Sequence, residues 1–130
     1  MARLLLHAAL GLGVLLAGLP AAQAQSGDAQ RGRGLFESRC GGCHSLDEHR
    51  VGPALGNVVG RAAGKRADFA YSAALAAATH VWTPDKLLVW LTDPEALVPG
   101  QAMGYRLSDA ADRRDVVAFL RSLGPGQPAR

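Results

Sequence analysis

The sequence predicts an all-α domain. Segments with apolar residues at helical spacing recur along the chain, and no stretch alternates apolar and polar residues for long enough to indicate a strand. Gly and Pro, at 16 and 7 residues, separate these segments as loops. A length of 130 residues is enough for one domain and too short for two ordinary ones. We therefore expect a few short helices joined by long loops.

The first two helices are expected in the N-terminal half of this domain. Residues from 28 to about 41 are helix formers, with Gly32 placed one turn before Phe36 on the same face. A second, short helix is expected in the alanine-rich segment 71–78.

The last two helices carry capping signals. Thr83 is a good N-cap, Pro84 suits the first helical position, and this helix should stop before Asp93-Pro94. Ser108 is expected to cap the last helix, and Gly124-Pro125 is expected to end it. The apolar residues of the last helix follow a 3.6-residue period: Val116, Val117, Phe119, Leu120 and Leu123.

Composition and charge exclude several classes of protein. Hydrophobic residues make up 48% and charged residues 19%, which is too apolar for a disordered chain. Two cysteines are too few for a disulfide scaffold. The formal charge is +3, and the basic residues form no block of the kind that binds nucleic acid.

The N-terminal segment predicts export. Arg3 is followed by a nearly continuous apolar stretch from Leu4 to Leu19, and Ala22-Gln23-Ala24 resembles a cleavage site. A membrane anchor is the alternative, but Pro20 ends the stretch before the length of about 20 residues that spans a bilayer. We expect residues 1–24 to be a signal peptide cleaved after Ala24, and residues 25–130 to work in the periplasm.

Cys40 and Cys43 form a C-x-x-C-H motif with His44. A thioredoxin-like site would follow a strand, whereas a helix is expected before Cys40. A zinc site would need two further ligands, for which only His49 and His80 remain in the exported chain. A plain disulfide is the third possibility. Covalent haem attachment uses both thiols and the adjacent histidine, and the motif favours this fourth interpretation.

A haem held by His44 requires either a second axial ligand or an open site. Met103 is the one methionine of the exported chain, and it lies in a Pro/Gly-rich loop rather than on an apolar helix face. His49 is too close to His44 in sequence to reach the opposite haem face readily, and His80 precedes a helix start. Met103 is favoured over either histidine and over an open site.

Further motifs follow the C-x-x-C-H segment in a fixed order: Gly52-Pro53-x-Leu55, Gly60-Arg61, Trp82 and Pro99-Gly100-x-x-Met103. Together they resemble a class I monohaem cytochrome c of the soluble bacterial periplasmic type, from Gly27 almost to Leu123. The resemblance implies four to five short helices wrapped around one covalent haem c, in a domain of residues 25–130 with an ordered core at about 27–123.

The resemblance also implies the roles of the residues at the iron. Cys40 and Cys43 would form the thioether links, and His44 and Met103 would be the axial ligands. The carbonyl of Pro53 would accept a hydrogen bond from the other ring nitrogen of His44, which fixes the tautomer of the histidine.

Other positions correspond to residues around the haem. Arg61, Tyr71 and Trp82 match partners of the haem propionates, and Tyr105 matches an aromatic residue that shields the haem edge. The resemblance implies a contact between the first and last helices through Gly32, Phe36, Val116 and Phe119.

The sequence departs from the family at two places. Trp90 stands where the family often has a tyrosine near the methionine sulfur. The lysine ring at the haem edge is thin: Arg39 is present, but Glu95 and Ala102 occupy places where lysines are common. These departures weaken the case for a partner that reads a strongly positive ring.

The functional expectation is a monomeric one-electron carrier and not an enzyme, since two axial ligands leave no place for a small-molecule substrate at iron. It would dock transiently at the exposed haem edge with membrane or periplasmic redox proteins, between a quinol-oxidising complex and an oxidase, reductase or photosynthetic reaction centre. The first alternative is a dedicated haem subunit of a periplasmic dehydrogenase that oxidises a sulfur compound or an alcohol. A gas sensor or peroxidase with an open distal site, and a thiol oxidoreductase without haem, are further alternatives.

Overall fold

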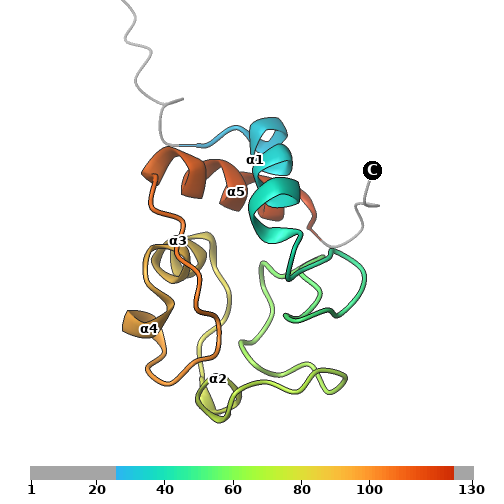
Figure 1. Ribbon diagram of the computed structural model, residues 1–130, viewed down its shortest axis with the longest axis vertical. Helices are drawn as coiled ribbons and strands as arrows, with labels where there is room; N and C mark the ends of the chain where they lie inside the picture. The colour runs from blue at the N-terminus through green and yellow to red at the C-terminus, as the bar shows by residue number, and fades with distance from the viewer. Residues whose placement is uncertain (1–25, 125–130) are drawn as a thin grey trace, which may run out of the picture.

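Short helices make up the regular structure of residues 26–124, the part of the chain that the computed structural model describes (Figure 1). The α-helices are α1 (Ala29–Leu35), α2 (Ala73–Ala77), α3 (Pro84–Thr92), α4 (Pro94–Leu97) and α5 (Ala110–Ser122), and a π-helical turn, Phe36–Cys40, continues α1. Within this range, strand-like pairing is limited to one isolated antiparallel bridge between Ala62 and Val81. The all-α prediction is confirmed. The predicted signal peptide and Pro125 lie outside the described residues.

Local caps explain where the first three α-helices begin. The Asp28 carboxylate accepts hydrogen bonds from the backbone N–H groups of Gln30 and Arg31, at 2.8 and 3.1 Å. Ser72 and Thr83 cap α2 and α3 in the same way, each with its hydroxyl 3.2 Å from a backbone nitrogen in the first turn. Each side-chain oxygen satisfies an N–H group that has no partner within its helix.

The start of α5 corrects one prediction. Asp109, and not Ser108, is the N-cap, with its carboxylate 2.9 Å from the backbone nitrogen of Asp112. Arg113 donates from the first turns of α5 to the carbonyls of Leu107 and Ser108, which holds the chain before the helix in a non-helical path. Both residue types are good caps, but a carboxylate also interacts favourably with the positive end of the helix dipole.

One helix, α4, was missed by the sequence prediction. The chain leaves α3 at Asp93, as expected, but only for one residue, because α4 begins at Pro94. Asp93 has an extended backbone and caps α4 by accepting from the N–H groups of Glu95 and Ala96, while Arg106 pairs with it at 2.8 Å. One carboxylate therefore ends one helix, begins the next and holds the loop that follows.

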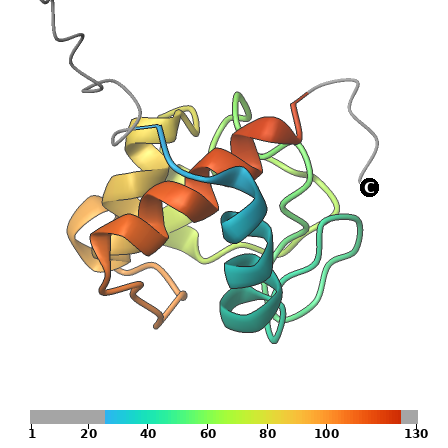
Figure 2. The same cartoon turned by 90° about the horizontal axis from the view of Figure 1, so that it is seen from above.

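Helices α1 and α5 lie against each other, as both views show (Figure 2). Gly32 is buried at the crossing, where a Cβ atom would lie 1.9 Å from the carbonyl oxygen of Asp115. The rings of Phe36 and Phe119 are 5.6 Å apart, and the Asp28 backbone N–H donates to the Asp115 carboxylate at 2.7 Å. The predicted contact between the first and last helices is therefore present, and it depends on a residue without a side chain.

The helices and the long segment 41–72, which contains no α-helix, surround an internal cavity. Several core residues of α3 and α5 also form its wall, among them Leu87, Trp90, Leu91, Val116 and Leu120. The hydrophobic core and the cavity are thus continuous. Among residues 26–124 no helix is long and apolar enough to cross a bilayer.

Candidate functional site

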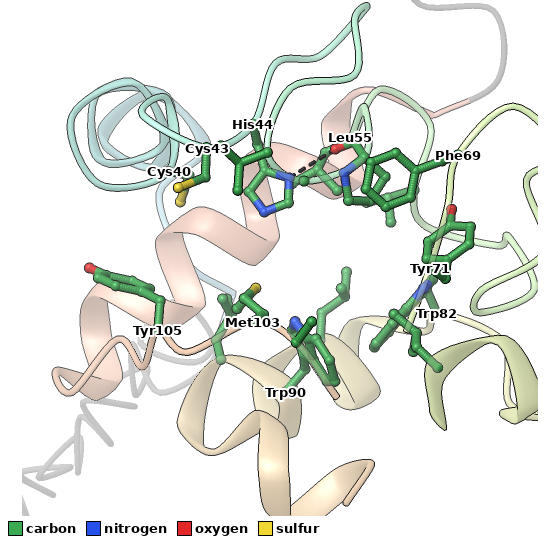
Figure 3. A pocket seen from close by; sticks show the side chains of 18 of the residues that line it. Cys40, Cys43, His44, Leu55, Phe69, Tyr71, Trp82, Trp90, Met103 and Tyr105 are labelled. Carbon is green, nitrogen blue, oxygen red and sulfur yellow. Dashed lines mark hydrogen bonds between the residues drawn. The ribbon is translucent and has the colours of Figure 1, made fainter. Parts of the chain in front are cut away.

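The cavity has a volume of about 420 Å³ and a mostly apolar wall (Figure 3). Its wall comes from every part of the described chain, from Phe36 and Leu55 through Trp82 to Leu120. A well-packed domain of this size does not ordinarily leave a void of this volume. The cavity is therefore suited to a large, flat, apolar group that completes the core.

The C-x-x-C-H segment forms a tight turn at the wall of this cavity. The backbone N–H groups of Cys43 and His44 both donate to the carbonyl of Cys40, at 3.1 and 2.9 Å. The two thiols form no disulfide; Cys40 is half-buried and Cys43 is exposed. Burial, with a smaller contribution from Cys43, raises the pKa of the Cys40 thiol to about 11. A redox-active dithiol has a lowered thiol pKa, so this environment does not suit a thioredoxin-like site.

His44 is fixed in one orientation by its neighbours. Its Nδ1 atom lies 2.8 Å from the carbonyl oxygen of Pro53. A carbonyl only accepts hydrogen bonds, so Nδ1 carries the proton and the lone pair of Nε2 is free to bind a metal. Gly52 makes this position possible, because a Cβ atom there would lie 2.2 Å from His44 Cε1. The structure thus brings together His44 and Pro53 as the resemblance implied.

Met103 lies on the wall opposite His44, and both side chains point into the cavity (Figure 3). It belongs to a loop between α4 and α5, as the sequence predicts. The carboxylate of Glu95 accepts from the backbone N–H of Gly100 at 2.8 Å, and the N–H of Leu107 donates to the carbonyl of Leu91 at 2.9 Å. These bonds hold the loop on both sides of Met103.

The predicted propionate partners line another part of the same cavity. Arg61, half-buried, donates to the carbonyl of Ala54 at 2.9 Å, and burial lowers the pKa of its guanidinium. The Tyr71 hydroxyl and the Trp82 indole N–H have no hydrogen-bond partner among residues 26–124. Three donors therefore border the cavity beside an otherwise apolar wall, as an anionic edge of a bound group would require.

His49 and His80, the competing ligands, do not line the cavity. His49 accepts from the backbone N–H of Ala54 at 3.0 Å and lies 3.1 Å from the Asp68 carboxylate. The ring of His80 packs edge-on against Trp82, with centroids 4.6 Å apart. Within residues 26–124 no three His, Cys, Asp or Glu side chains form a metal-binding group. Neither histidine therefore joins Cys40 and Cys43 in a zinc site.

Sequence reasoning missed one aromatic residue of the wall, Phe69, and placed a second, Trp90, near the methionine sulfur only through the family resemblance. Phe69 packs on Tyr71 with ring centroids 4.9 Å apart, and Trp90 packs on Trp82 at 5.2 Å. Phe69 stands two residues before Tyr71, which would place both rings on one side of an extended chain and could have indicated its position. Trp90 was noted only as a departure from the family.

The residues present fit a covalently held haem. Two free thiols stand at the wall beside a histidine whose metal-binding nitrogen is available, and a thioether faces that histidine across an apolar cavity. A small helical fold with this kind of cavity is typical of a class I c-type cytochrome.

Comparison with known proteins agrees with this class. Residues 29–124 match the cytochrome c family. The chain is 41% identical over 100 residues to cytochrome c-type cyt cy of Rhodobacter capsulatus, covering 75% of this chain and 50% of that protein. It is 41% identical over 100 residues to a cytochrome c of Euglena viridis, covering 75% of this chain and 98% of that one. The solved structure of cytochrome cH from Methylobacterium extorquens matches with a TM-score of 0.70 and 39% identity, over 74% of this chain and 99% of the other.

The chain belongs to the cytochrome c family. It spans half the length of the Rhodobacter capsulatus relative and nearly all of the Euglena viridis one. As a member of this family it binds covalent haem c with iron, and it is an electron-transfer protein rather than an enzyme.

Proposed function

We propose that the protein is a periplasmic one-electron carrier that uses a His/Met-ligated haem c. It would run between a quinol-oxidising membrane complex and a terminal oxidase, a reductase or a photosynthetic reaction centre. The observation that carries this proposal is the placement of His44 and Met103 on opposite walls of one apolar cavity. When bound, the haem supplies the Fe(III)/Fe(II) couple that carries the electron.

Cys40 and Cys43 would hold the haem by thioether links, and His44 and Met103 would bind its iron. The carbonyl of Pro53 keeps the proton of His44 on Nδ1, which leaves the lone pair of Nε2 available to a metal. The soft sulfur of Met103 favours the reduced metal and raises the reduction potential relative to two histidines.

The surroundings of the site favour electron transfer over bond chemistry. If His44 and Met103 both bound the iron, no position would be left there for a substrate. The apolar wall excludes water, and the hydrogen bonds that hold Met103 and His44 limit their movement when the charge changes. Arg61, Tyr71 and Trp82 offer donors for the propionates, which otherwise would carry unpaired charge at the cavity wall.

Export is part of this proposal. Ala22-Gln23-Ala24 follows an apolar segment, and c-type haem attachment needs two reduced thiols at the moment of attachment in an oxidising compartment. Cleavage after Ala24 would leave 13 basic and 11 acidic residues, a formal charge of +2. The exported domain would act as a monomer that docks transiently through its exposed haem edge.

A second candidate is a dedicated haem subunit of a periplasmic dehydrogenase that oxidises a sulfur compound or an alcohol. Glu95 and Ala102 are compatible with it, because a weakly charged haem edge suits one fixed partner as well as several transient ones. Size-exclusion chromatography of the native protein separates the two, since a subunit elutes with its partner and a carrier elutes alone.

The test is a redox titration of the haem-loaded protein and its Met103→Leu variant, both followed by the visible spectrum. We expect one reversible single-electron transition for the unmodified protein and a large fall of the potential in the variant. A variant with an unchanged potential and spectrum would show that Met103 is not the ligand. It would favour the histidine-ligated form, or the open distal site of a sensor or peroxidase.

A further inference from the structure

The cavity opens to solvent over a face that we name the mouth. It consists of the exposed cavity residues of two segments, 39–51 and 102–105. Its members are Arg39, Cys43, Val51, Ala102, Gly104 and Tyr105. Tyr105 lies on the same side of the cavity as Cys40 and Cys43 (Figure 3). One member out of six is charged, so the mouth is mainly apolar.

Val51 is the most prominent apolar group of this face. Its side chain is 80% exposed, against 47% for Val89 on the outer side of α3 and 39% for Tyr105. Two backbone hydrogen bonds hold it there: Gly52 N–H donates to the Cys43 carbonyl at 2.8 Å, and Arg50 N–H donates to the Gly52 carbonyl at 2.9 Å. A rigid apolar group gains free energy when a partner covers it, with little loss of conformational entropy.

Several charged side chains near the mouth are held by partners within the protein. Arg106, which follows Tyr105, pairs with Asp93 at 2.8 Å. Arg33 pairs with Glu37 at 3.0 Å, one and two turns before Cys40. The Glu95 carboxylate is occupied by the backbone of its own loop. The two ion pairs reduce the long-range field that Arg106 and Arg33 would otherwise offer to a charged partner.

Two guanidinium groups on the cysteine side of the mouth, those of Arg39 and Arg50, form no ion pair among residues 26–124. Arg39 immediately precedes Cys40 and is exposed. Arg50 precedes Val51 and donates to the carbonyl of Gly41 at 2.9 Å, which fixes its position but leaves its charge uncompensated. The positive charge is thus confined to one edge of an apolar face.

We propose that the mouth docks a redox protein whose own face is apolar and nearly uncharged, with a carboxylate at one edge that meets Arg39 and Arg50. This inference rests on the proposed carrier function and specifies the chemistry of its partner. An acidic partner face, of the kind that binds a ring of lysines, fits poorly, because the mouth presents the exposed apolar groups of Val51 and Tyr105 and a single charged member, Arg39.

The first test measures electron transfer to two oxidised copper proteins, one with an apolar uncharged docking face and one with an acidic face. One electron leaves the reduced haem iron, which becomes Fe(III), and reduces Cu(II) to Cu(I), without movement of a proton. For the apolar-faced probe we expect the second-order rate constant to change less than about threefold between about 10 mM and about 300 mM salt. A rate that is faster with the acidic-faced probe and falls more than about tenfold over this range would overturn the proposal.

The second test places a charge at the centre of the mouth. Val51→Lys should lower the rate constant with the apolar-faced probe about tenfold, because docking would bury an unpaired ammonium group. Val89→Lys is the matched control, since Val89 is also an exposed valine but does not line the cavity, and its rate should stay unchanged. Equal rates for the two variants would contradict the proposal.

The third test needs no electron transfer and separates this proposal from the proposed function. Both proteins are reduced, and NMR chemical-shift changes of the haem protein are mapped as the apolar-faced probe is added. We expect the changes to centre on Val51, Ala102 and Tyr105, and to weaken in Arg39→Gln. Changes centred elsewhere would refute the docking face, even if the redox titration still shows a one-electron carrier. A protein that binds here but shows no reversible redox transition would instead refute the carrier function.

Discussion

Gly32 is the position where one added methyl group should damage the fold most. An ideal Cβ atom there lies 1.9 Å from the Asp115 carbonyl oxygen, 2.4 Å from its carbon and 3.0 Å from Phe119 Cβ. Carbon and carbonyl oxygen in contact normally stay at least about 3.3 Å apart. Helices α1 and α5 would have to separate by more than an ångström, because backbone atoms of Asp115 cannot turn away as a long side chain would.

The free-energy change has two opposing parts. Alanine is a better helix former than glycine by about 1 kcal/mol. Overpacking costs about 1–3 kcal/mol and more where backbones must move. Separation of α1 and α5 would also weaken the Phe36–Phe119 contact and the hydrogen bond from the Asp28 N–H to Asp115. We therefore expect Gly32→Ala to lower the free energy of unfolding by about 2–4 kcal/mol.

Gly34→Ala is the matched control. Gly34 belongs to the same helix, and no atom lies within 4 Å of its ideal Cβ position. This variant should be stabilised by up to about 1 kcal/mol, since only the helix propensity changes. Urea unfolding of both haem-loaded variants, followed by circular dichroism, gives the comparison. Equal stabilities, or a loss below about 0.5 kcal/mol in Gly32→Ala, would refute the close crossing of α1 and α5.

Three further outcomes follow from single contacts. Gly52→Ala should displace the His44 ring, because the new Cβ atom would lie 2.2 Å from it, and the visible spectrum should change. In the control variant Gly42→Ala, no atom lies within 4 Å of the new Cβ atom, and the spectrum should not change. Burial, with a smaller effect of a nearby lysine, lowers the pKa of His80, so the unfolded chain binds its proton more readily. The free energy of unfolding should therefore fall as the pH drops below about 6.5. Urea unfolding at two pH values should show a smaller fall for His80→Leu than for the unmodified protein. Asp93→Ala should lower the free energy of unfolding by about 1–2 kcal/mol, because it removes the cap of α4. A melting temperature equal to that of the unmodified protein would contradict this.

Sequence reasoning predicted the elements whose signals are local. Asp28 and Thr83 start α1 and α3, because a cap acts within its own turn and needs no distant partner. Ser108 and Asp109 are both good caps, and the choice between them depends on contacts of Arg113 with the preceding loop. Helix α4, with four residues, is too short to show periodicity.

For the candidate site, sequence reasoning predicted the residue types but not all of their contacts. The C-x-x-C-H motif and the lone methionine indicate a haem and its ligands from residue type and spacing alone. The hydrogen bond between His44 and Pro53 entered only through the family resemblance, because the two residues lie nine positions apart in a segment without periodic structure. The neutralised charges around the mouth could not be predicted, since a salt bridge such as that of Arg106 with Asp93 depends on the path of the loop.

The visible spectrum of the exported protein, recorded oxidised and reduced and again after denaturation, tests the ligand set most directly. We expect the haem to stay attached after denaturation, because Cys40 and Cys43 hold it covalently, and the oxidised protein to show a red-region band from the Met103 sulfur on ferric iron. Covalent haem without that band would refute Met103 as the ligand. No haem, from cells that attach it to other proteins, would contradict the whole assignment of this cavity.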